Sequence, residues 1–151
     1  MESLLTIIIT IFCGVSVYIL GEIAHEIWLK PLEQYKQIKS EISYSLVYYA
    51  NVYSNVIDLA DDQEMTIESH KHASDEFRIL AAKLHGFIET LFWLKPLIPP
   101  KEKLLEASQE LMGLSNSFFC AYKTHETHEQ NRENRQYAER IRELLGMVSN
   151  I

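Results

Sequence analysis

The chain has 151 residues, of which 47% are hydrophobic and 23% charged, and its formal net charge is −7. This length suits a single domain, and the acidic balance argues against a surface that binds nucleic acid. Only five glycines and four prolines are present, which argues against a strand-and-turn architecture. The two cysteines, Cys13 and Cys120, lie in segments too different to pair with each other, as expected in a reducing compartment.

The chain opens on an apolar segment, and the nineteen residues from Ser3 to Gly21 carry no formal charge. As a helix they would measure about 28 Å, close to the hydrocarbon thickness of a bilayer. A secretory signal would need a basic start and a small-residue cleavage site, and the core helix of a soluble domain is rarely apolar on every face. We therefore expect a retained transmembrane helix with a juxtamembrane extension over residues 3–29.

Lysines follow this apolar segment, whereas the residues before it carry no basic side chain. Lys30, Lys36 and Lys39 all lie within about twenty residues of the span. Lysine and arginine stay on the cytoplasmic side, which predicts a single-pass membrane protein with a cytosolic C-terminus. Trp28 and Lys30 are the residues expected at the membrane interface.

Small residues form a ridge along the predicted span. Thr6, Thr10 and Gly14 are spaced by four, and Gly21 follows seven residues later. Because close backbone approach drives helix association in lipid, this ridge predicts that the span helps to form a homo-oligomer. A seven-residue repeat continues from the ridge into the segment after the predicted span, at Gly14, Gly21, Trp28, Tyr35, Ile42, Tyr49 and Val56. Such a repeat favours supercoiling of helices about each other. The alternative is that the repeat arises by coincidence and marks an ordinary core face.

The predicted cytosolic body, residues 31–122, reads as a small helical bundle. Pro31 should kink or restart the helix, since it lacks an N–H group and clashes with the preceding turn. Apolar residues at helical spacing then predict one long helix over about 32–59. A second apolar set widens the stripe and predicts burial on more than one face; it consists of Tyr44, Val47 and Tyr48.

Two further helices are expected in the body. The acidic segment 61–76 has no helical stripe and is expected to be an exposed connection, with Ser74 as an N-cap. The following helix buries Phe77, Leu80, Leu84, Phe87, Ile88 and Leu91, and Pro96 ends it. The run "LFWLKPLI" is expected to pack in the core, the alternative being the membrane interface. A third helix is expected from Pro100 to Tyr122.

The tail, residues 123–151, changes character. Its first fourteen residues are polar, typical of a solvated helix or a linker. A short amphipathic helix follows, with apolar residues at Tyr137, Ile141, Leu144, Leu145 and Val148. Its apolar face must dock on the protein's own body, on a second subunit or on the membrane surface.

Motifs of catalysis are scarce. The sequence has no glycine-rich phosphate loop and no CxxC pair. The segment Gly113-Leu-Ser-Asn-Ser117 lacks the second glycine of a nucleophile elbow, so we interpret it as a place where small side chains admit another helix. We predict no catalytic and no cofactor-binding residues.

Three histidine clusters could in principle bind a metal. They are Glu22, His25 and Glu26; His70 and His72; and His125, Glu126, His128 and Glu129. The first is half of a di-iron Glu-x-x-His motif, but a second half is not visible. We predict polar surface at all three and no metal site, the alternative being a metal-dependent enzyme built on a membrane-tethered bundle.

Finally, the order of parts resembles a widespread, uncharacterised group of small bacterial single-span membrane proteins. The likeness covers roughly residues 15–120 and consists of Pro31, Glu41-Ile42, Tyr49-Ala50-Asn51 and Leu114-Ser115-Asn116. It implies a place in the bacterial inner membrane, and it implies no reaction and no catalytic residue. Proteins of this layout often serve in stress or phage-defence systems, so we expect an interaction or effector protein. Its expected partners are the bilayer, further copies of itself, and a cytosolic protein or small-molecule signal.

Overall fold

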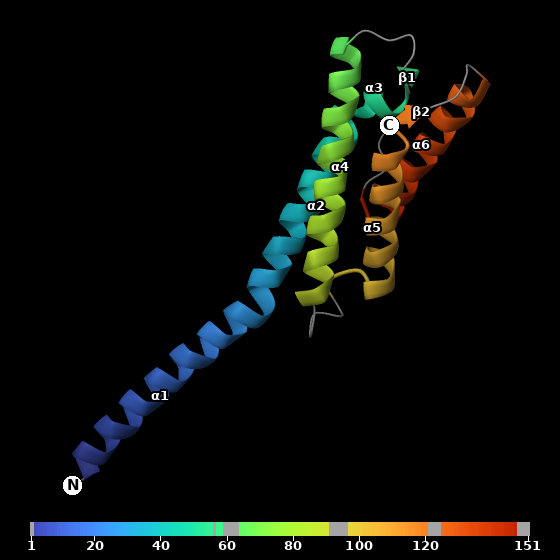
Figure 1. The fold of residues 1–151 in the computed structure, drawn as a ribbon. Coiled ribbons are helices and arrows are strands. Elements are labelled where there is room, and N and C mark those ends of the chain that lie inside the picture. The colour runs from blue at the N-terminus through green and yellow to red at the C-terminus, as the bar shows by residue number, and fades with distance from the viewer. Residues whose placement is uncertain (1, 56, 59–63, 91–96, 121–124, 148–151) are drawn as a thin grey trace.

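The computed structural model describes residues 2–55, 57–58, 64–90, 97–120 and 125–147 (Figure 1). It is all-α, as predicted, apart from one pair of two-residue strands. The elements in chain order are α1 (Glu2–Ala24), the π-helix η1 (His25–Leu29), α2 (Lys30–Tyr48), α3 (Ala50–Tyr53), β1 (Ile57–Asp58), α4 (Glu64–Thr90), α5 (Lys101–Asn116), β2 (Phe119–Cys120) and α6 (His125–Leu144).

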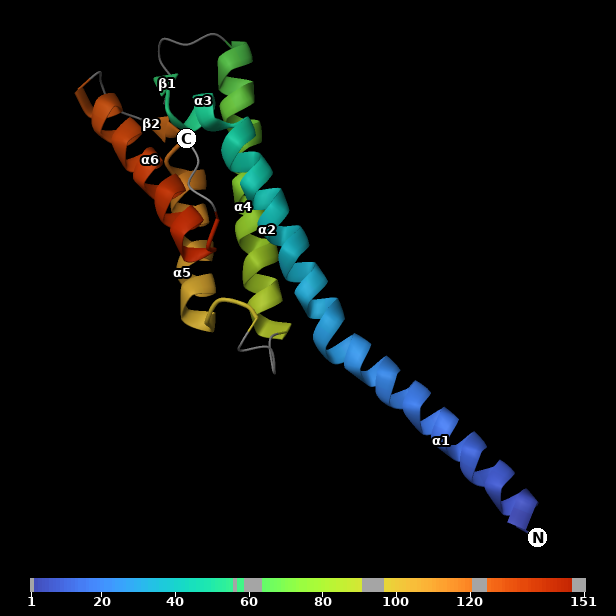
Figure 2. The ribbon, with the colours of Figure 1, turned by 180° about the vertical axis from the view of Figure 1, so that it is seen from behind.

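The body is a bundle in which α2, α4, α5 and α6 run alternately up and down (Figure 1). Helix α4 lies between α2 and α5, and α6 packs against α5. Helix α1 continues α2 almost end to end and projects away from the bundle, with no other element beside it (Figure 2). The predicted order, an apolar N-terminal helix followed by a helical bundle, is confirmed.

Apolar side chains from every bundle helix meet in one core. The stripe expected on α4 is buried where the structure describes it, from Phe77 to Ile88. Burying such side chains is the main stabilising term of a small domain. The largest fully buried ones are Phe77, Phe118, Ile42, Leu46, Leu80, Leu84, Ile88, Leu104, Leu111, Leu114, Ile141 and Leu145.

The long helix expected over 32–59 is shorter than predicted. Helix α2 ends at Tyr48, because Tyr49 leaves helical geometry at φ −95° and ψ 16°. Only the short helix α3 follows, and the side chain of Asn134 on α6 donates a 3.0 Å hydrogen bond to the Tyr53 carbonyl at its end. A partner eighty-one residues away thus satisfies a carbonyl that a longer helix would have used.

The expectation of an exposed connection over 61–76 is wrong from Glu64 onward, where α4 begins. This first part of α4 buries small and polar side chains, so it shows no apolar stripe; the buried residues are His70, Ala73 and Ser74. Ser74 is therefore not an N-cap but a mid-helix residue. The predicted apolar run Leu91–Pro96 lies outside the described residues, while Leu97 is exposed and Ile98 is buried.

Helix α5 also ends earlier than expected, at Asn116 rather than at Tyr122. The amide of Ser117 bonds to the carbonyls of Gly113 and Leu114 and closes the last turn. The chain then forms β2, which pairs in parallel with β1. Cys120 accordingly lies in a strand and not at the end of a helix.

The polar tail segment is helical from His125 onward, and the described part of the tail packs on the protein's own body. The apolar face of α6 joins the common core through Ala138, Ile141 and Leu145. The helix ends in a Schellman motif: the Met147 amide bonds to the Arg142 carbonyl at 2.8 Å, and Gly146 adopts φ +59°. Of the three docking partners considered for this face, the structure selects the protein's own bundle.

Helix α2 secures this end of α6. The Tyr35 hydroxyl donates to the Leu145 carbonyl at 3.3 Å, and the Lys39 ammonium donates to the Gly146 carbonyl at 2.9 Å. Burial raises the pKa of Tyr35 to about 12, so this hydroxyl stays protonated and remains a donor at physiological pH. A positive charge at the C-terminal end of a helix also interacts favourably with the helix dipole.

Candidate functional site

The most distinctive feature of the molecule is the uncovered helix α1. Among the described residues, the helical stretch Ser3–Tyr48 contains the one segment long and apolar enough to cross a membrane, with a mean hydropathy of 2.4 over eighteen residues. None of that segment is buried in the structure. A core helix of a soluble protein would be covered by its own fold, so this helix leaves a large apolar surface for another environment.

Two hydroxyl groups within α1 are bonded inside the helix. Thr10 donates to the Thr6 carbonyl, and Ser16 donates to the Phe12 carbonyl, both at 2.8 Å. A hydroxyl bonded in this way can enter hydrocarbon at low cost, because no donor is left unsatisfied. The predicted packing residues Thr6, Thr10, Gly14 and Gly21 lie on this helix, and a Cβ atom added at either glycine would meet no atom within 4 Å.

A π-turn joins α1 to the body. The Lys30 amide bonds to the His25 carbonyl five residues back, just before Pro31, which cannot donate to the carbonyl four residues before it. Lys30 forms a 2.9 Å ion pair with Glu26, and the Trp28 side chain is exposed. The two residues predicted for the membrane interface thus lie in and directly after this turn.

The π-turn breaks the predicted seven-residue repeat. Tyr35 and Ile42, two of its positions, are buried in the protein's own core. A π-turn takes up one extra residue, so α2 is rotated by about 100° relative to an uninterrupted helix. The repeat beyond α1 therefore marks an ordinary core face on α2, the alternative interpretation of the pattern.

The histidine clusters do not converge on a metal site where the structure describes them. Among the described residues no group of three or more His, Cys, Asp and Glu side chains is placed to hold an ion. The side chains of His125, Glu126 and His128 lie outside those described. The buried His70 has Nε2 2.9 Å from the Asn55 carbonyl, whereas His72 has Nδ1 2.8 Å from the Tyr49 hydroxyl.

The serine segment after Gly113 joins helices, as interpreted from the sequence. Ser115 Oγ donates to the Ser74 carbonyl and Ser74 Oγ donates to the Ser115 carbonyl, both at 2.8 Å. A Cβ atom on Gly113 would lie 3.0 Å from the ring of Tyr137, so glycine lets α6 approach α5 closely. Ser115 is buried and its proton is held by a carbonyl, which makes it a joint between α4 and α5.

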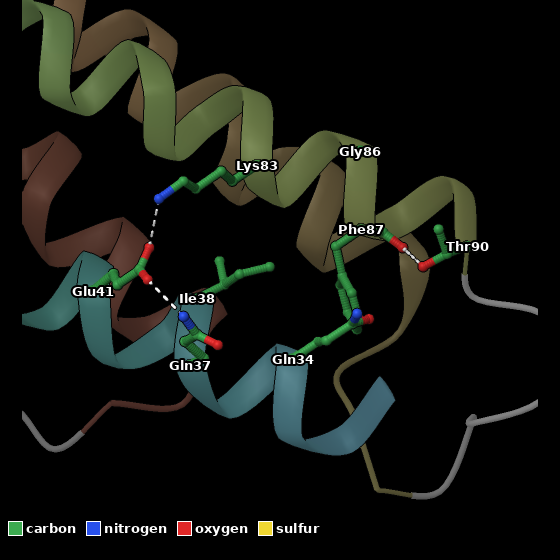
Figure 3. A pocket seen from close by; sticks show the side chains of 8 residues that line it. All are labelled: Gln34, Gln37, Ile38, Glu41, Lys83, Gly86, Phe87 and Thr90. Atoms are coloured by element: carbon green, nitrogen blue, oxygen red, sulfur yellow. Dashed lines mark hydrogen bonds and ion pairs between the residues drawn. The ribbon is translucent and has the colours of Figure 1, made fainter. Parts of the chain in front are cut away.

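A shallow groove of about 330 Å³ lies between α2 and α4 (Figure 3). Ile38 and Phe87 form its apolar wall, and polar side chains form the rest: Gln34, Gln37, Glu41, Lys83 and Thr90. Lys83 bonds to Glu41 at 2.9 Å and holds the pKa of that carboxyl below its usual value. The two charges neutralise each other between α2 and α4. This ion pair therefore holds the two helices together and leaves neither charge free for a ligand.

Sequence reasoning missed the polar contacts that join the helices. The Ser74–Ser115 pair, the Tyr49–His72 pair and Asn134 each link residues far apart in the chain. Short-range patterns carry no signal for such pairs, because serine and asparagine in a helix are typical of solvent-facing positions.

No protein-family model, no curated protein and no solved structure matches this chain.

Proposed function

We propose that the protein is a single-pass membrane protein whose helical body lies in the cytosol and binds a second copy of the same chain. The observation that carries the proposal is the uncovered stretch Ser3–Gly21 of α1, which carries no formal charge and in which the hydroxyls of Thr10 and Ser16 are satisfied within the helix. Only a membrane-like environment satisfies such a surface without a large protein partner. A role as an effector in a stress or phage-defence system stays a prediction.

The orientation rests on charge. Lys30, Lys36 and Lys39 follow the span, and acidic side chains nearby weigh little in the positive-inside rule, so the ion pair of Lys30 with Glu26 does not weaken it. We expect a C-terminal green fluorescent protein fusion to be bright and a C-terminal alkaline phosphatase fusion to be inactive. The opposite pattern of the two fusions would place the body outside and overturn the proposed orientation.

The second copy is expected to meet the span at its small-residue ridge. Gly14→Leu puts a bulky side chain where two backbones should approach, and it should weaken association by about 1–2 kcal/mol, several-fold in the fraction of dimer. The fold of the monomer should not change, because nothing lies within 4 Å of a Cβ atom at Gly14. Association is measured with a membrane two-hybrid assay of the full-length chain.

The matched control is Ile8→Leu, an exposed position on the same helix that lies off the ridge. It should leave the two-hybrid signal unchanged. Equal signals from wild type and Gly14→Leu would show that the ridge is not part of the interface.

A further inference from the structure

The outward side of α2 carries aromatic and apolar side chains that the bundle does not cover. The sequence predicts burial for Tyr44, Val47 and Tyr48, yet they are 65%, 57% and 64% exposed. The rings of Tyr44 and Tyr48 stack at 5.5 Å, and Tyr48 meets Tyr49 edge-on at 4.8 Å. We call these three side chains, Tyr44, Val47 and Tyr48, the aromatic face. Tyrosine-rich exposed surface of this kind is enriched at protein–protein interfaces.

This face is too far from the span to be a lipid contact. Tyr44 lies fourteen residues after Lys30, which is about 21 Å of helix, whereas a headgroup layer is only about 5–8 Å deep. A protein surface is therefore the partner that could cover it.

The π-turn sets the direction in which the aromatic face points. With about 100° per residue and one residue taken up by the π-turn, Tyr44 lies about 20° from Gly14 around the helix axis, Val47 about 40° and Tyr48 about 60°. By the same count Tyr35 lies about 160° and Ile42 about 180° from Gly14. The small-residue ridge and the aromatic face thus share one side of the α1–α2 rod, and the bundle is attached to the other.

Charges between these two patches suit a parallel pair of identical helices. Glu33 lies near the line of Gly14 and Lys36 about 60° from it on the same count. Both side chains are exposed, and neither has an ion pair with any described residue. On the same count Thr10 and Gly21 lie about 40° and 20° from Gly14 on the side of Lys36, so the contact line of the ridge runs between Glu33 and Lys36. In a parallel dimer with this contact line, Glu33 of each copy would face Lys36 of the other, as opposite charges do beside a coiled-coil interface.

We propose that a second copy of the chain docks in parallel along this whole side of the rod, from the ridge in the membrane to the aromatic face in the cytosol. The inference rests on the proposed homo-oligomer and names the cytosolic half of its interface. It also gives the π-turn a consequence: by rotating α2, it directs the core face inward and leaves the aromatic face aligned with the ridge. The bundles then lie on the outside of the dimer and do not collide.

Disulfide cross-linking of the full-length chain in membranes tests this arrangement. In a Cys13→Ser, Cys120→Ser background, Tyr44→Cys should form a disulfide-linked dimer on mild oxidation in several times the yield of Gln109→Cys. Gln109 is an exposed residue of α5, which α4 separates from α2 (Figure 1). Equal yields from the two variants would overturn the proposed face.

A third variant, Gly14→Cys, distinguishes the failure of this inference from the failure of the proposed function. Cross-linking through Gly14→Cys without cross-linking through Tyr44→Cys would overturn the cytosolic interface and leave the span dimer standing. Cross-linking through neither would overturn both.

Charge exchange provides an independent readout. Glu33→Lys and Lys36→Glu should each lower the two-hybrid signal several-fold, because like charges then face each other, and the double variant should restore it. Since Lys36 also bears on orientation, each variant is checked with the C-terminal green fluorescent protein fusion. A double variant as weak as the weaker single variant would contradict the pairing.

Discussion

A chain carrying both Phe12→Arg and Val15→Arg should leave the membrane fraction. Each arginine near the middle of a span costs about 2.5–3.5 kcal/mol in insertion, so the pair removes most of the drive to insert a single helix. The body should still fold, because the apolar segment of α1 is not buried against it. The measurement is immunoblotting of carbonate-washed membranes and of the supernatant after ultracentrifugation.

Phe12→Leu with Val15→Leu is the matched control, since it changes the same two positions and keeps them apolar. This variant should stay in the washed membrane pellet with the wild type. If the double-arginine chain also stayed there, α1 would not be the anchor, and the proposed function would fail with it.

The apolar helix could be predicted from sequence because its signal is local. Length, absence of charge and apolar character on every side are all properties of one contiguous segment, and they need no partner to be recognised. The stripe from Phe77 to Ile88 was equally predictable, since its apolar side chains recur at helical spacing and are buried. The fold class and the order of apolar helix and bundle follow from these two patterns.

The parts that could not be predicted depend on distant partners. His70 and Ser74 are buried in α4 through contacts with Asn55 and Ser115, and nothing near them in sequence indicates those contacts. The lack of an apolar stripe therefore suggested a loop where a partly buried helix lies. Pro31 predicted a kink. Whether the helix breaks at this proline or continues through a π-turn depends on how α2 packs.

The opposite error occurred on the outer side of α2. Tyr44, Val47 and Tyr48 follow the helical period and suggest core, yet the bundle leaves them exposed. Periodicity shows that a face is apolar and not which molecule covers it. The apolar period did not predict burial within the monomer. It is nevertheless the reason why this face is a candidate for the interface of the proposed dimer.

Replacing Phe77 by alanine should have the largest effect on the body. Its side chain is fully buried on α4, with its ring stacked on Phe118 at 5.7 Å and edge-on to Tyr49 at 5.9 Å. Removing a phenylalanine from such a site costs about 3–5 kcal/mol through lost burial and the cavity that remains. The free energy of unfolding of a small domain is only about 5–15 kcal/mol, so this substitution should remove a large fraction of it.

Pulse proteolysis of the full-length chain across a urea series, in membranes, measures this loss. Ile79→Ala is the control, because Ile79 lies on the same helix with half of its side chain exposed, and it should shift the midpoint far less. Phe77→Ala should remain in the washed membranes even where its body is cleaved, since α1 makes no packing contact that depends on Phe77. Anchor and body would then fail separately, the reverse of the double-arginine chain, whereas loss of Phe77→Ala from the membrane would mean that insertion needs the folded bundle.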